Sequence, residues 1–309
     1  MAAFLPTLKQ LQYLTALHIH GHFGRAAEAC FVTQSTLSAG LAELESLLGV
    51  RLVERNRRVV RFSPMGERVV AKAYDVLREA DELSGLTVGG DNPLSGPLRL
   101  GVIPTIAPYL LPRALPQVRA DWPDLKLHLR EEMSGPATEA LSRGMLDMVL
   151  LALPWETPGL TLMPLFDDPF FLVFRPGDLP DPPPAVAPGS IDPLQLLLLE
   201  DGHCLKDQAL LACGRPELRA DPTQRGTSLI TLVQMVAGGL GQTLVPKLAL
   251  DAGIIVGSGL IARPVSGPVS GPKSGSAART VALVWRQGSP REAEFRLLGE
   301  SLMAGLALS

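Results

Sequence analysis

The amino-terminal fold is decided by the stretch FGRAAEACFVTQSTLSAGLAELESLLGVRLVERNRRVVRFSPMGERVV, residues 23–70. Its first section, residues 23–30, contains small alanines and predicts a short helix. A turn at 31–33 follows, and leucines at helical spacing then predict a second helix from residue 33 or 34 to Gly49. Because the alanines let the two helices approach closely, the pattern is typical of a helix-turn-helix.

A basic hairpin is predicted directly after these helices. Residues 51–55 and 59–62 look like two short strands around an Asn-Arg-Arg turn. Between residues 51 and 61 there are five arginines and one glutamate, a local charge of +4. Upstream, apolar residues at helical spacing over residues 8–17 predict a further helix. The segment therefore reads as a helical domain with a basic wing.

Length and composition limit the classes of protein that fit. At 309 residues the chain can hold two or three domains, and its net charge of −3 does not indicate nucleic-acid binding by the molecule as a whole. Three cysteines argue against a disulfide framework and for a reducing compartment. No apolar run approaches the roughly 18 residues of a membrane span, and the amino terminus does not resemble a signal peptide. We expect a soluble cytoplasmic protein with no membrane partner.

Residues 64–84 predict a long helix with an apolar seam. Proline is tolerated in the first turn of a helix, where Pro64 stands. Steps of four and three, the spacing of a heptad, separate Val69, Ala73, Val76, Ala80 and Leu83. The residues alone leave two interpretations open, a seam that pairs with a second copy of the chain and an ordinary core face.

The remainder of the chain predicts an α/β fold. Gly- and Pro-rich residues 89–97 form a hinge, after which short apolar runs alternate with helical stretches, as expected of α/β layers with mostly parallel sheets. The predicted strands are residues 98–103, 125–131, 148–151, 170–174, 196–199, 243–245 and 281–285. Two segments read as connections: the proline-rich loop 176–193, and residues 266–272, where Val-Ser-Gly-Pro repeats.

A cysteine pair lies in the segment HCLKDQALLAC, residues 203–213. Lys206 and His203 lie close to Cys204, and a nearby positive charge favours the reactive thiolate. The residues between Cys204 and Cys213 are good helix formers, so a helix would separate the two cysteines by roughly 13 Å. A disulfide needs Cα atoms within about 7 Å, so bridging the pair would unwind or bend that helix. The other interpretation is that both thiols are small core hydrophobes; the spacing fits no common metal motif.

Residues 23–70 resemble the winged helix-turn-helix of LysR-type transcriptional regulators. The resemblance implies that the exposed start of the recognition helix lies near DNA and includes Gln34, Ser35, Thr36 and Ser38. It also implies phosphate contacts by the wing residues Arg55, Arg57 and Arg58. The recognition helix departs from the family pattern because it carries Glu43 and Glu45 and no basic residue, which shifts the expected phosphate attraction onto the wing. We interpret Cys30 as a core residue.

The family resemblance also implies the arrangement of domains. We expect a winged helix-turn-helix domain at 1–63, a linker and dimerisation helix at 64–88, a hinge at 89–97, and a two-lobed regulatory domain, similar to periplasmic binding proteins, at 98–309. Lobe I takes residues 98–167 and 278–309, and lobe II takes residues 168–277. The stretch 264–277 looks like an insertion.

Four further segments resemble the peroxide-sensing members of this family: LRLGVIPTIAPYLLP at 98–112, EDGHCLKDQALLAC at 200–213, TSLITLVQMVAGGLGQTLVP at 227–246 and RTVALVWRQGSP at 279–290. By that resemblance Cys204 is the peroxidatic residue, which becomes a sulfenic acid, and Cys213 resolves it to a disulfide. The residues expected to bind peroxide or support the thiolate are Thr105, Ser134, His203, Lys206, Asp207 and Arg279. Thr105 taken alone reads equally as a helix cap.

The sequence therefore predicts a DNA-binding transcription factor that hydrogen peroxide switches through its cysteine pair. One alternative is a LysR-type regulator controlled by a small effector in the cleft between the lobes. Another is a thiol peroxidase, which is disfavoured because a turnover catalyst has no need of a basic wing; we expect no enzyme, metal or cofactor. The expected partners are double-stranded DNA, hydrogen peroxide, further copies of the chain in a dimer or tetramer, RNA polymerase and a thiol-disulfide reductant.

Overall fold

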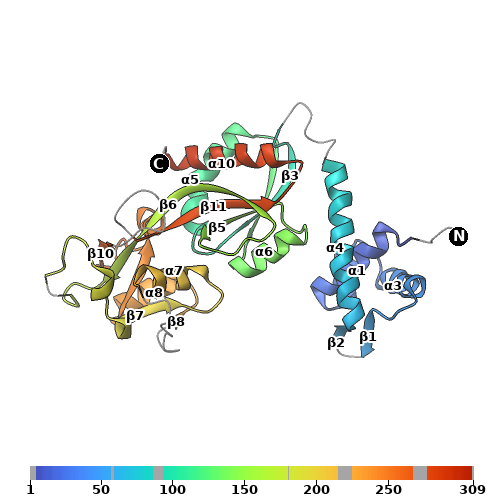
Figure 1. Ribbon diagram of the computed structural model, residues 1–309, viewed down its shortest axis with the longest axis horizontal. Coiled ribbons are helices and arrows are strands. Elements are labelled where there is room, and N and C mark those ends of the chain that lie inside the picture. Colours follow the sequence, from blue (N-terminus) through green and yellow to red (C-terminus); the bar gives the residue numbers. More distant parts are fainter. Residues whose placement is uncertain are drawn as a thin grey trace. The chain divides into compact units, whose positions relative to one another are not determined.

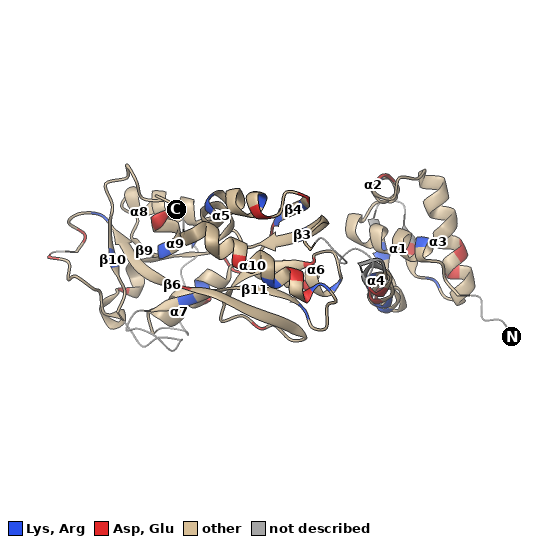
Figure 2. Cartoon of the chain, turned by 90° about the horizontal axis from the view of Figure 1, so that it is seen from above, with Lys and Arg blue, Asp and Glu red and all other residues tan. Residues whose placement is uncertain are grey.

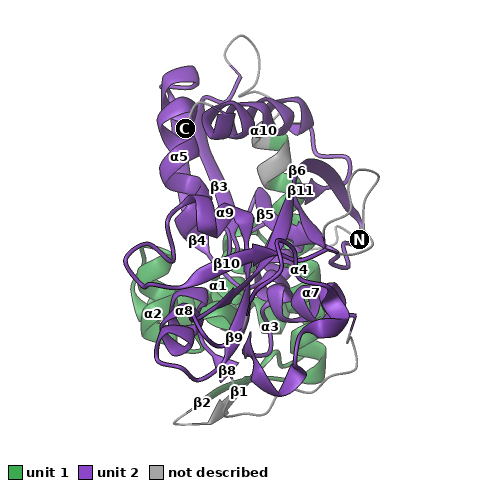
Figure 3. Cartoon of the chain, turned by 90° about the vertical axis from the view of Figure 1, so that its left-hand side faces the viewer, with its two compact units in different colours: residues 1–88 green, residues 89–309 purple. Residues whose placement is uncertain are grey.

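A computed structural model describes residues 5–56, 59–85, 93–179, 181–214, 225–266 and 277–307. The chain divides into two compact units, residues 1–88 and residues 89–309 (Figure 3). Each unit has its own core, and we describe each by itself.

Unit 1 is a helix-turn-helix with a two-stranded wing and a long final helix. Its elements are α1 (Leu8–His20), α2 (Phe23–Ala29), α3 (Gln34–Leu48), β1 (Val53–Asn56), β2 (Val59–Phe62) and α4 (Pro64–Gly85) (Figure 1). The two wing strands are antiparallel, with Val53 opposite Phe62. The helices and strands predicted for residues 8–84 are confirmed.

Local signals in unit 1 set where its helices begin and end. Thr7 and Gln10 form a capping box at the start of α1. Thr33 accepts a hydrogen bond from the Thr36 amide and caps α3. Gly49 ends α3 in the left-handed conformation, which favours glycine. The residues that flank α3 on either side therefore determine where this helix begins and ends.

Close packing of α1 against α3 depends on a glycine. A Cβ added to Gly40 would come within 2.8 Å of the ring of Tyr13. The two leucines Leu14 and Leu17 of α1 and the two leucines Leu37 and Leu44 of α3 are fully buried. These spacings of three and seven residues place the leucines on one face of each helix, and that face is buried.

Among its described residues, unit 2 contains nine strands and the helices that cover them. The strands are β3 (Gly96–Val102), β4 (Leu125–Glu131), β5 (Met148–Leu153), β6 (Leu160–Phe174), β7 (Leu196–Leu199), β8 (Arg225–Gly226), β9 (Gln242–Pro246), β10 (Ile261–Pro264) and β11 (Ala278–Arg286). The helices are α5 (Ala107–Asp121), α6 (Ser134–Ser142), α7 (Cys204–Ala212), α8 (Leu229–Ala237), α9 (Lys247–Asp251) and α10 (Glu292–Ala307). Of two single turns of 3-10 helix, Pro188–Ser190 lies in the proline-rich loop and Pro193–Gln195 lies at its end.

The strands of unit 2 follow one path, β4-β3-β5-β11-β6-β9-β7-β8, with β10 paired to β6. The prediction of mostly parallel sheets is wrong. Parallel pairs occur toward the two ends of this path, whereas β6 and β11 pair antiparallel with each other and with their neighbours β5, β9 and β10. The reason is that two long strands cross between the lobes in opposite directions.

The two lobes share the crossing strands β6 and β11 (Figure 1). One lobe holds β3, β4 and β5 with α5, α6 and α10, and the other holds β7, β8, β9 and β10 with α7, α8 and α9. At 15 residues, β6 spans roughly 50 Å and reaches both. Side chains at the crossing therefore meet residues from either lobe. Most of the insertion expected at 264–277 lies outside the described residues.

Candidate functional site

One helix carries both cysteines of the pair. Cys204 is the first residue of α7 and Cys213 is its C-cap, as the sequence predicted for a helix between them. Both cysteines are thiols, and both are buried. A helix of this length separates its ends by roughly 13 Å. The structure therefore holds the two sulfurs of the dithiol form apart.

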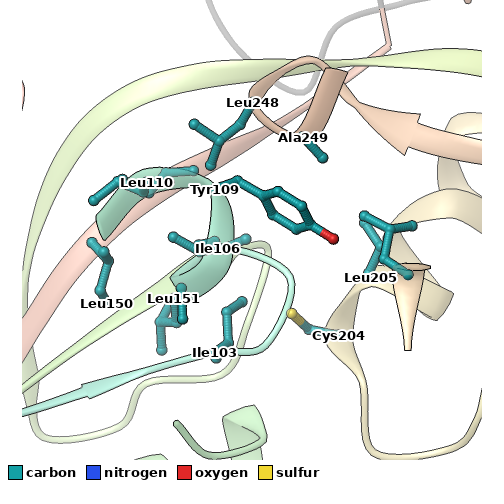
Figure 4. Close-up of a cluster of buried hydrophobic side chains, with 14 of the residues drawn as sticks. Ile103, Ile106, Tyr109, Leu110, Leu150, Leu151, Cys204, Leu205, Leu248 and Ala249 are labelled. Carbon is teal, nitrogen blue, oxygen red and sulfur yellow. The ribbon is translucent and has the colours of Figure 1, made fainter. Parts of the chain in front are cut away.

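Cys204 faces the lobe to which it does not belong. Its sulfur points toward Ile103 in the loop after β3 (Figure 4). Ser134 at the start of α6 and the backbone of Ala152 in β5 also act on the thiol. Only 4% of the Cys204 surface is exposed, so bulky reagents have little access to the thiol.

Burial and charge act in opposite directions on the Cys204 thiol. Burial raises its pKa above the ordinary value for cysteine, and the charge of exposed Asp207 raises it further. The Ser134 hydroxyl, the Arg279 guanidinium and the Ala152 backbone lower the pKa. The net direction is upward, so the resting residue is mainly a thiol, with three groups placed to favour the thiolate.

The hydroxyl of Ser134 is buried beside Cys204. It lowers the pKa of the thiol as a hydrogen-bonding neighbour, yet among the described residues the serine oxygen has no further hydrogen-bond partner. A buried polar atom without a partner loses the hydrogen bonds that water would supply. The oxygen of Ser134 is thus available to a small polar molecule at the thiol.

A buried arginine organises the residues at the crossing of the lobes. Arg279 donates from Nη1 to Thr105 Oγ1 at 2.9 Å and from Nη2 to the Thr105 carbonyl at 3.0 Å. Its Nε donates to Asp168 Oδ2 at 3.0 Å, and its Nη2 lies 3.0 Å from the same oxygen. Thr105 does not cap α5, because the N-cap is Ile106 and no side chain bonds there. The arginine instead fixes the loop that carries Thr105.

Asp168 is a site residue that the sequence analysis missed. It is 1% exposed, and its Oδ1 accepts a hydrogen bond of 2.8 Å from the Leu248 amide of α9. Burial raises the pKa of Asp168, while Arg279 and the Leu248 amide act to lower it. The feature of the sequence that could have revealed it is the Asp167–Asp168 pair directly before the predicted apolar strand 170–174. A carboxylate buried beside such a strand needs a cation as its partner. Asp168 joins Arg279 to the lobe that holds Cys204.

The charges near Cys204 in the sequence do not act as expected. Lys206 pairs with Asp201, which also binds Arg225 at 2.9 Å. Burial lowers the pKa of buried His203, which makes the neutral ring the favoured form at pH 7; Glu200 and the Thr227 backbone oppose this. The cation that lowers the pKa of the thiol is therefore the distant Arg279 rather than either neighbour in the chain.

Two further residues join the lobes at this point. Gln208 of α7, which is buried, donates from Nε2 to the Ala152 carbonyl at 2.9 Å. Tyr109 of α5 directs its hydroxyl toward Leu205 (Figure 4). Burial, with a contribution from Glu131, raises the pKa of Tyr109 to about 12 against the opposing charge of Arg279. Residue spacing gave no sign of either contact, because both partners are far away in the chain.

The predicted DNA-facing residues start α3. The side chains of Gln34, Ser35 and Thr36 are exposed and Ser38 is half-buried. The hydroxyl of Thr33 lies 2.9 Å from that of Ser35 and 2.8 Å from that of Thr36. These polar groups form a short, ordered edge at the beginning of the helix.

Charge along α3 is entirely negative, as Figure 2 shows. Its two charged residues are Glu43 and Glu45, of which Glu45 accepts from the amides of Leu52 and Val53 and so ties the helix to the wing. The side chain of Arg55, and Arg57 and Arg58 altogether, lie outside the described residues.

Neither a metal site nor a membrane span is found in the parts of the chain that the structure describes. No cluster of three or more His, Cys, Asp or Glu side chains is placed to hold a metal ion. No described helix combines the length and the apolar character needed to cross a bilayer.

Comparison with known proteins matches both units. The family described as bacterial regulatory helix-turn-helix protein, lysR family, matches residues 8–67, and the LysR substrate binding domain matches residues 91–307. The chain is 42% identical over 300 residues to the HTH-type transcriptional regulator EstR of Acinetobacter baylyi, with 96% of each chain covered. It is 39% identical over 305 residues to the hydrogen peroxide-inducible genes activator of Dickeya chrysanthemi, with 97% of this chain and 96% of the relative covered. A full-length variant of OxyR from Pseudomonas aeruginosa superimposes with a TM-score of 0.77 at 36% identity, covering 96% of this chain and 94% of that one.

Proposed function

This chain belongs to the LysR-type family of bacterial transcriptional regulators, and on that premise we propose that it is a DNA-binding regulator switched by hydrogen peroxide through Cys204 and Cys213. The observation that carries the proposal is the placement of both thiols at the ends of α7, with Cys204 set against Ser134 of the other lobe. The name of the relative from Dickeya chrysanthemi and the likeness to OxyR support the same stimulus.

The chemistry proposed for Cys204 is attack on one peroxide oxygen. The thiolate forms an S–O bond as the O–O bond breaks, and the leaving hydroxide takes a proton and departs as water. The thiolate of Cys213 then attacks the sulfenic sulfur of Cys204, and the oxygen leaves as a second water. Two thiols and one peroxide thus become one disulfide and two waters.

The residues around the thiol have roles that fit this reaction. Arg279 supplies the positive charge that favours the thiolate and holds Thr105 by two hydrogen bonds. The buried hydroxyl of Ser134, which lacks a standard partner among the described residues, is suited to bind a peroxide oxygen. Neutral His203 sits one residue before the nucleophile; one of its ring nitrogens carries a proton and the other can accept one. Asp207 is exposed and raises the pKa of the thiol, so we assign it no contact with peroxide.

Disulfide formation would act on the lobes through α7. Because a disulfide needs Cα atoms within about 7 Å, the helix must unwind for Cys213 to reach Cys204. Unwinding would break the hydrogen bond from Gln208 to the Ala152 carbonyl, which joins α7 to the other lobe. We propose that this loss, passed on to the arrangement of protomers on DNA, is the switch.

The DNA contacts proposed for unit 1 follow the same family arrangement. The start of α3, at Gln34, Ser35 and Thr36, would meet the major groove, and the wing arginines Arg57 and Arg58 would meet phosphates. As a bacterial regulator of transcription the protein would act in the cytoplasm, with RNA polymerase and a thiol-disulfide reductant as further partners.

Intact-mass analysis with disulfide mapping tests the proposal directly. Substoichiometric hydrogen peroxide should remove two mass units from the reduced protein, and the mapped bond should join Cys204 to Cys213. The same oxidised sample should bind promoter DNA in an altered footprint. A sample that keeps its mass, or whose bond involves Cys30, would refute the switch as proposed.

A second function is favoured by a different observation. The relative EstR is named as an HTH-type transcriptional regulator, and its name gives no peroxide stimulus. A hollow of about 630 Å³ lies between α5 and α9, lined by Pro108, Tyr109, Pro112, Arg113, Asp251 and Ala252. Control by a small effector in this hollow would leave the DNA response of a Cys204→Ser protein intact, which distinguishes it from the cysteine switch.

Dimerisation through α4 is proposed from its exposed seam. Val70, Ala73 and Tyr74 face the core, whereas Val76 is 40% exposed and Leu83 is 68% exposed. The core-face interpretation thus explains Ala73 but not the exposed Val76 and Leu83. A hollow of about 610 Å³ beside Val76, lined mostly by apolar groups that include Leu48 and Met65, continues the seam. We propose that a second copy of the chain covers it.

Val76→Asp should shift the protein toward monomer, because it would place an unpaired charge in the seam. Operator affinity should fall sharply, since two half-sites need a dimer. Ala71→Asp adds the same charge at another exposed position of α4 and should leave the oligomer unchanged. Sedimentation at low micromolar concentration measures both, and an intact oligomer for Val76→Asp would contradict the assignment.

A further inference from the structure

Phe31 exposes its whole ring in the turn between α2 and α3. At 96% exposure it is the most exposed large apolar side chain among the described residues. A phenylalanine ring carries a large apolar area, and its transfer from water to an apolar contact is favourable. In unit 1 this ring obtains none of that benefit.

The backbone at Phe31 is also unfavourable for this residue. Its φ is +55°, in the left-handed region, which only two other described non-glycine residues share. The Phe31 amide bonds the Glu28 carbonyl at 3.0 Å, and the Val32 amide bonds the Ala27 carbonyl at 3.0 Å. These two bonds make a Schellman motif, whose left-handed position is normally glycine. The backbone conformation at this position disfavours phenylalanine, and the ring adds no contact to the core of the free protein.

The position of Phe31 along the chain suggests what the ring is for. Thr33, two residues later, caps α3, and the exposed polar edge of Ser35 and Thr36 follows. The turn and the start of α3 therefore belong to one edge of the helix-turn-helix. Because α3 has no basic residue, its own side chains add no ion pair with phosphate at this edge.

We propose that Phe31 is a DNA-contacting residue, whose ring packs against apolar atoms of the double helix beside the start of α3. Two such surfaces occur in duplex DNA, the thymine methyl group in the major groove and the carbons of deoxyribose. The contact adds affinity that does not depend on released counterions, and so complements the arginines of the wing. The inference rests on the proposed placement of the α3 start against DNA.

The test uses the full-length reduced protein and a duplex selected by that protein from a random-sequence pool. Phe31→Asn suits the left-handed backbone and removes the ring. It should weaken binding about tenfold with an unchanged salt slope, while thermal stability stays level or rises. Phe31→Leu should retain most of the affinity. Arg57→Ala with Arg58→Ala should instead lower the salt slope by roughly two units.

Controls separate this inference from the wider proposal. Val256→Asn changes an apolar residue of unit 2 that is 84% exposed and should not affect binding. Gln34→Ala with Ser35→Ala should weaken binding; if it does not, the placement of α3 fails. If it does, and Phe31→Asn binds within twofold of the parent, only the inference about Phe31 fails.

Two other outcomes would also overturn it. A lower thermal midpoint for Phe31→Asn would mean that the ring packs within the protein, and a changed oligomeric state would mean that it contacts a second copy.

A duplex with uracil in place of thymine identifies the DNA surface that the ring contacts. If the affinity difference between parent and Phe31→Asn disappears on that duplex the ring contacts methyl groups, and if it persists the ring contacts deoxyribose.

Discussion

Cys204→Ser is expected to abolish disulfide formation and to slow peroxide consumption by roughly 10³-fold or more, because it removes the nucleophile itself. Operator binding should persist in one fixed mode, since residue 204 lies in unit 2 and the helix-turn-helix is in unit 1. Peroxide consumption by stopped flow and footprinting before and after oxidation measure the two effects. Consumption at the parental rate would show that another group reacts first.

Two other cysteine variants serve as matched controls for Cys204→Ser. Cys213→Ser should still react with one peroxide but stop at sulfenic acid or proceed to over-oxidised forms, because the resolving thiol is gone. Cys30→Ser should behave as the parent, since burial raises the pKa of the Cys30 thiol and no cation contributes to lowering it.

The pH dependence of the Cys213→Ser reaction follows from the pKa of Cys204. Burial raises that pKa, and only the thiolate attacks peroxide. The reaction rate should therefore increase with pH until the pH exceeds the raised pKa of Cys204. Ser134→Ala removes a group that lowers the pKa, and should shift the profile to higher pH. Iodoacetamide should react with folded Cys204 far more slowly than peroxide does, because the thiol is nearly inaccessible.

Asp168→Asn is expected to lower the free energy of unfolding of unit 2 by roughly 3 kcal/mol or more, because it leaves the Arg279 charge buried without its partner. Peroxide reactivity should change as well, since Asp168 helps to hold the guanidinium that binds Thr105. Chemical denaturation and the rate of peroxide consumption are the two measurements.

A double variant separates stability from reactivity at this pair. Asp168→Asn with Arg279→Met removes both charges and should recover much of the lost stability, yet the peroxide reaction should stay slow because the cation near Cys204 is absent. Asp178→Asn removes one partner of the exposed pair with Arg175 and should change neither quantity appreciably. Full reactivity in the double variant would show that Arg279 only supports the fold.

Local patterns in the sequence were sufficient for unit 1. Its helices have leucines at regular spacing and are bounded by Thr7, Thr33 and Gly49. The positions of these helices can therefore be predicted from residues that are close together in the chain. The strand β6 differs, because residues 160–169 mix apolar residues with threonine, aspartate and proline while they pair across the lobes. Only the apolar end at 170–174 was therefore recognised, and the antiparallel crossing was missed.

The candidate site could be predicted only where chemistry is visible along the chain. The cysteines and the helix between them were evident from their own segment, whereas Thr105, Ser134 and Arg279 were found by family resemblance. Lys206 appeared important because it is close in sequence, but its charge is directed to Asp201. Asp168 and Gln208 act through partners 111 and 56 residues away, and no local pattern reports such contacts.

The position of both cysteines at the ends of α7 also bears on how the regulator is returned to its resting state. In the proposed cycle, every interaction that favours the helix in the dithiol form works against the disulfide, and so raises its reduction potential. For a two-electron couple, ~1.4 kcal/mol of helix stability corresponds to ~30 mV. The buried Leu205 and Leu210, and the hydrogen bond of Gln208, are among those interactions. The packing of one short helix would thereby set how readily cellular thiols end the signal.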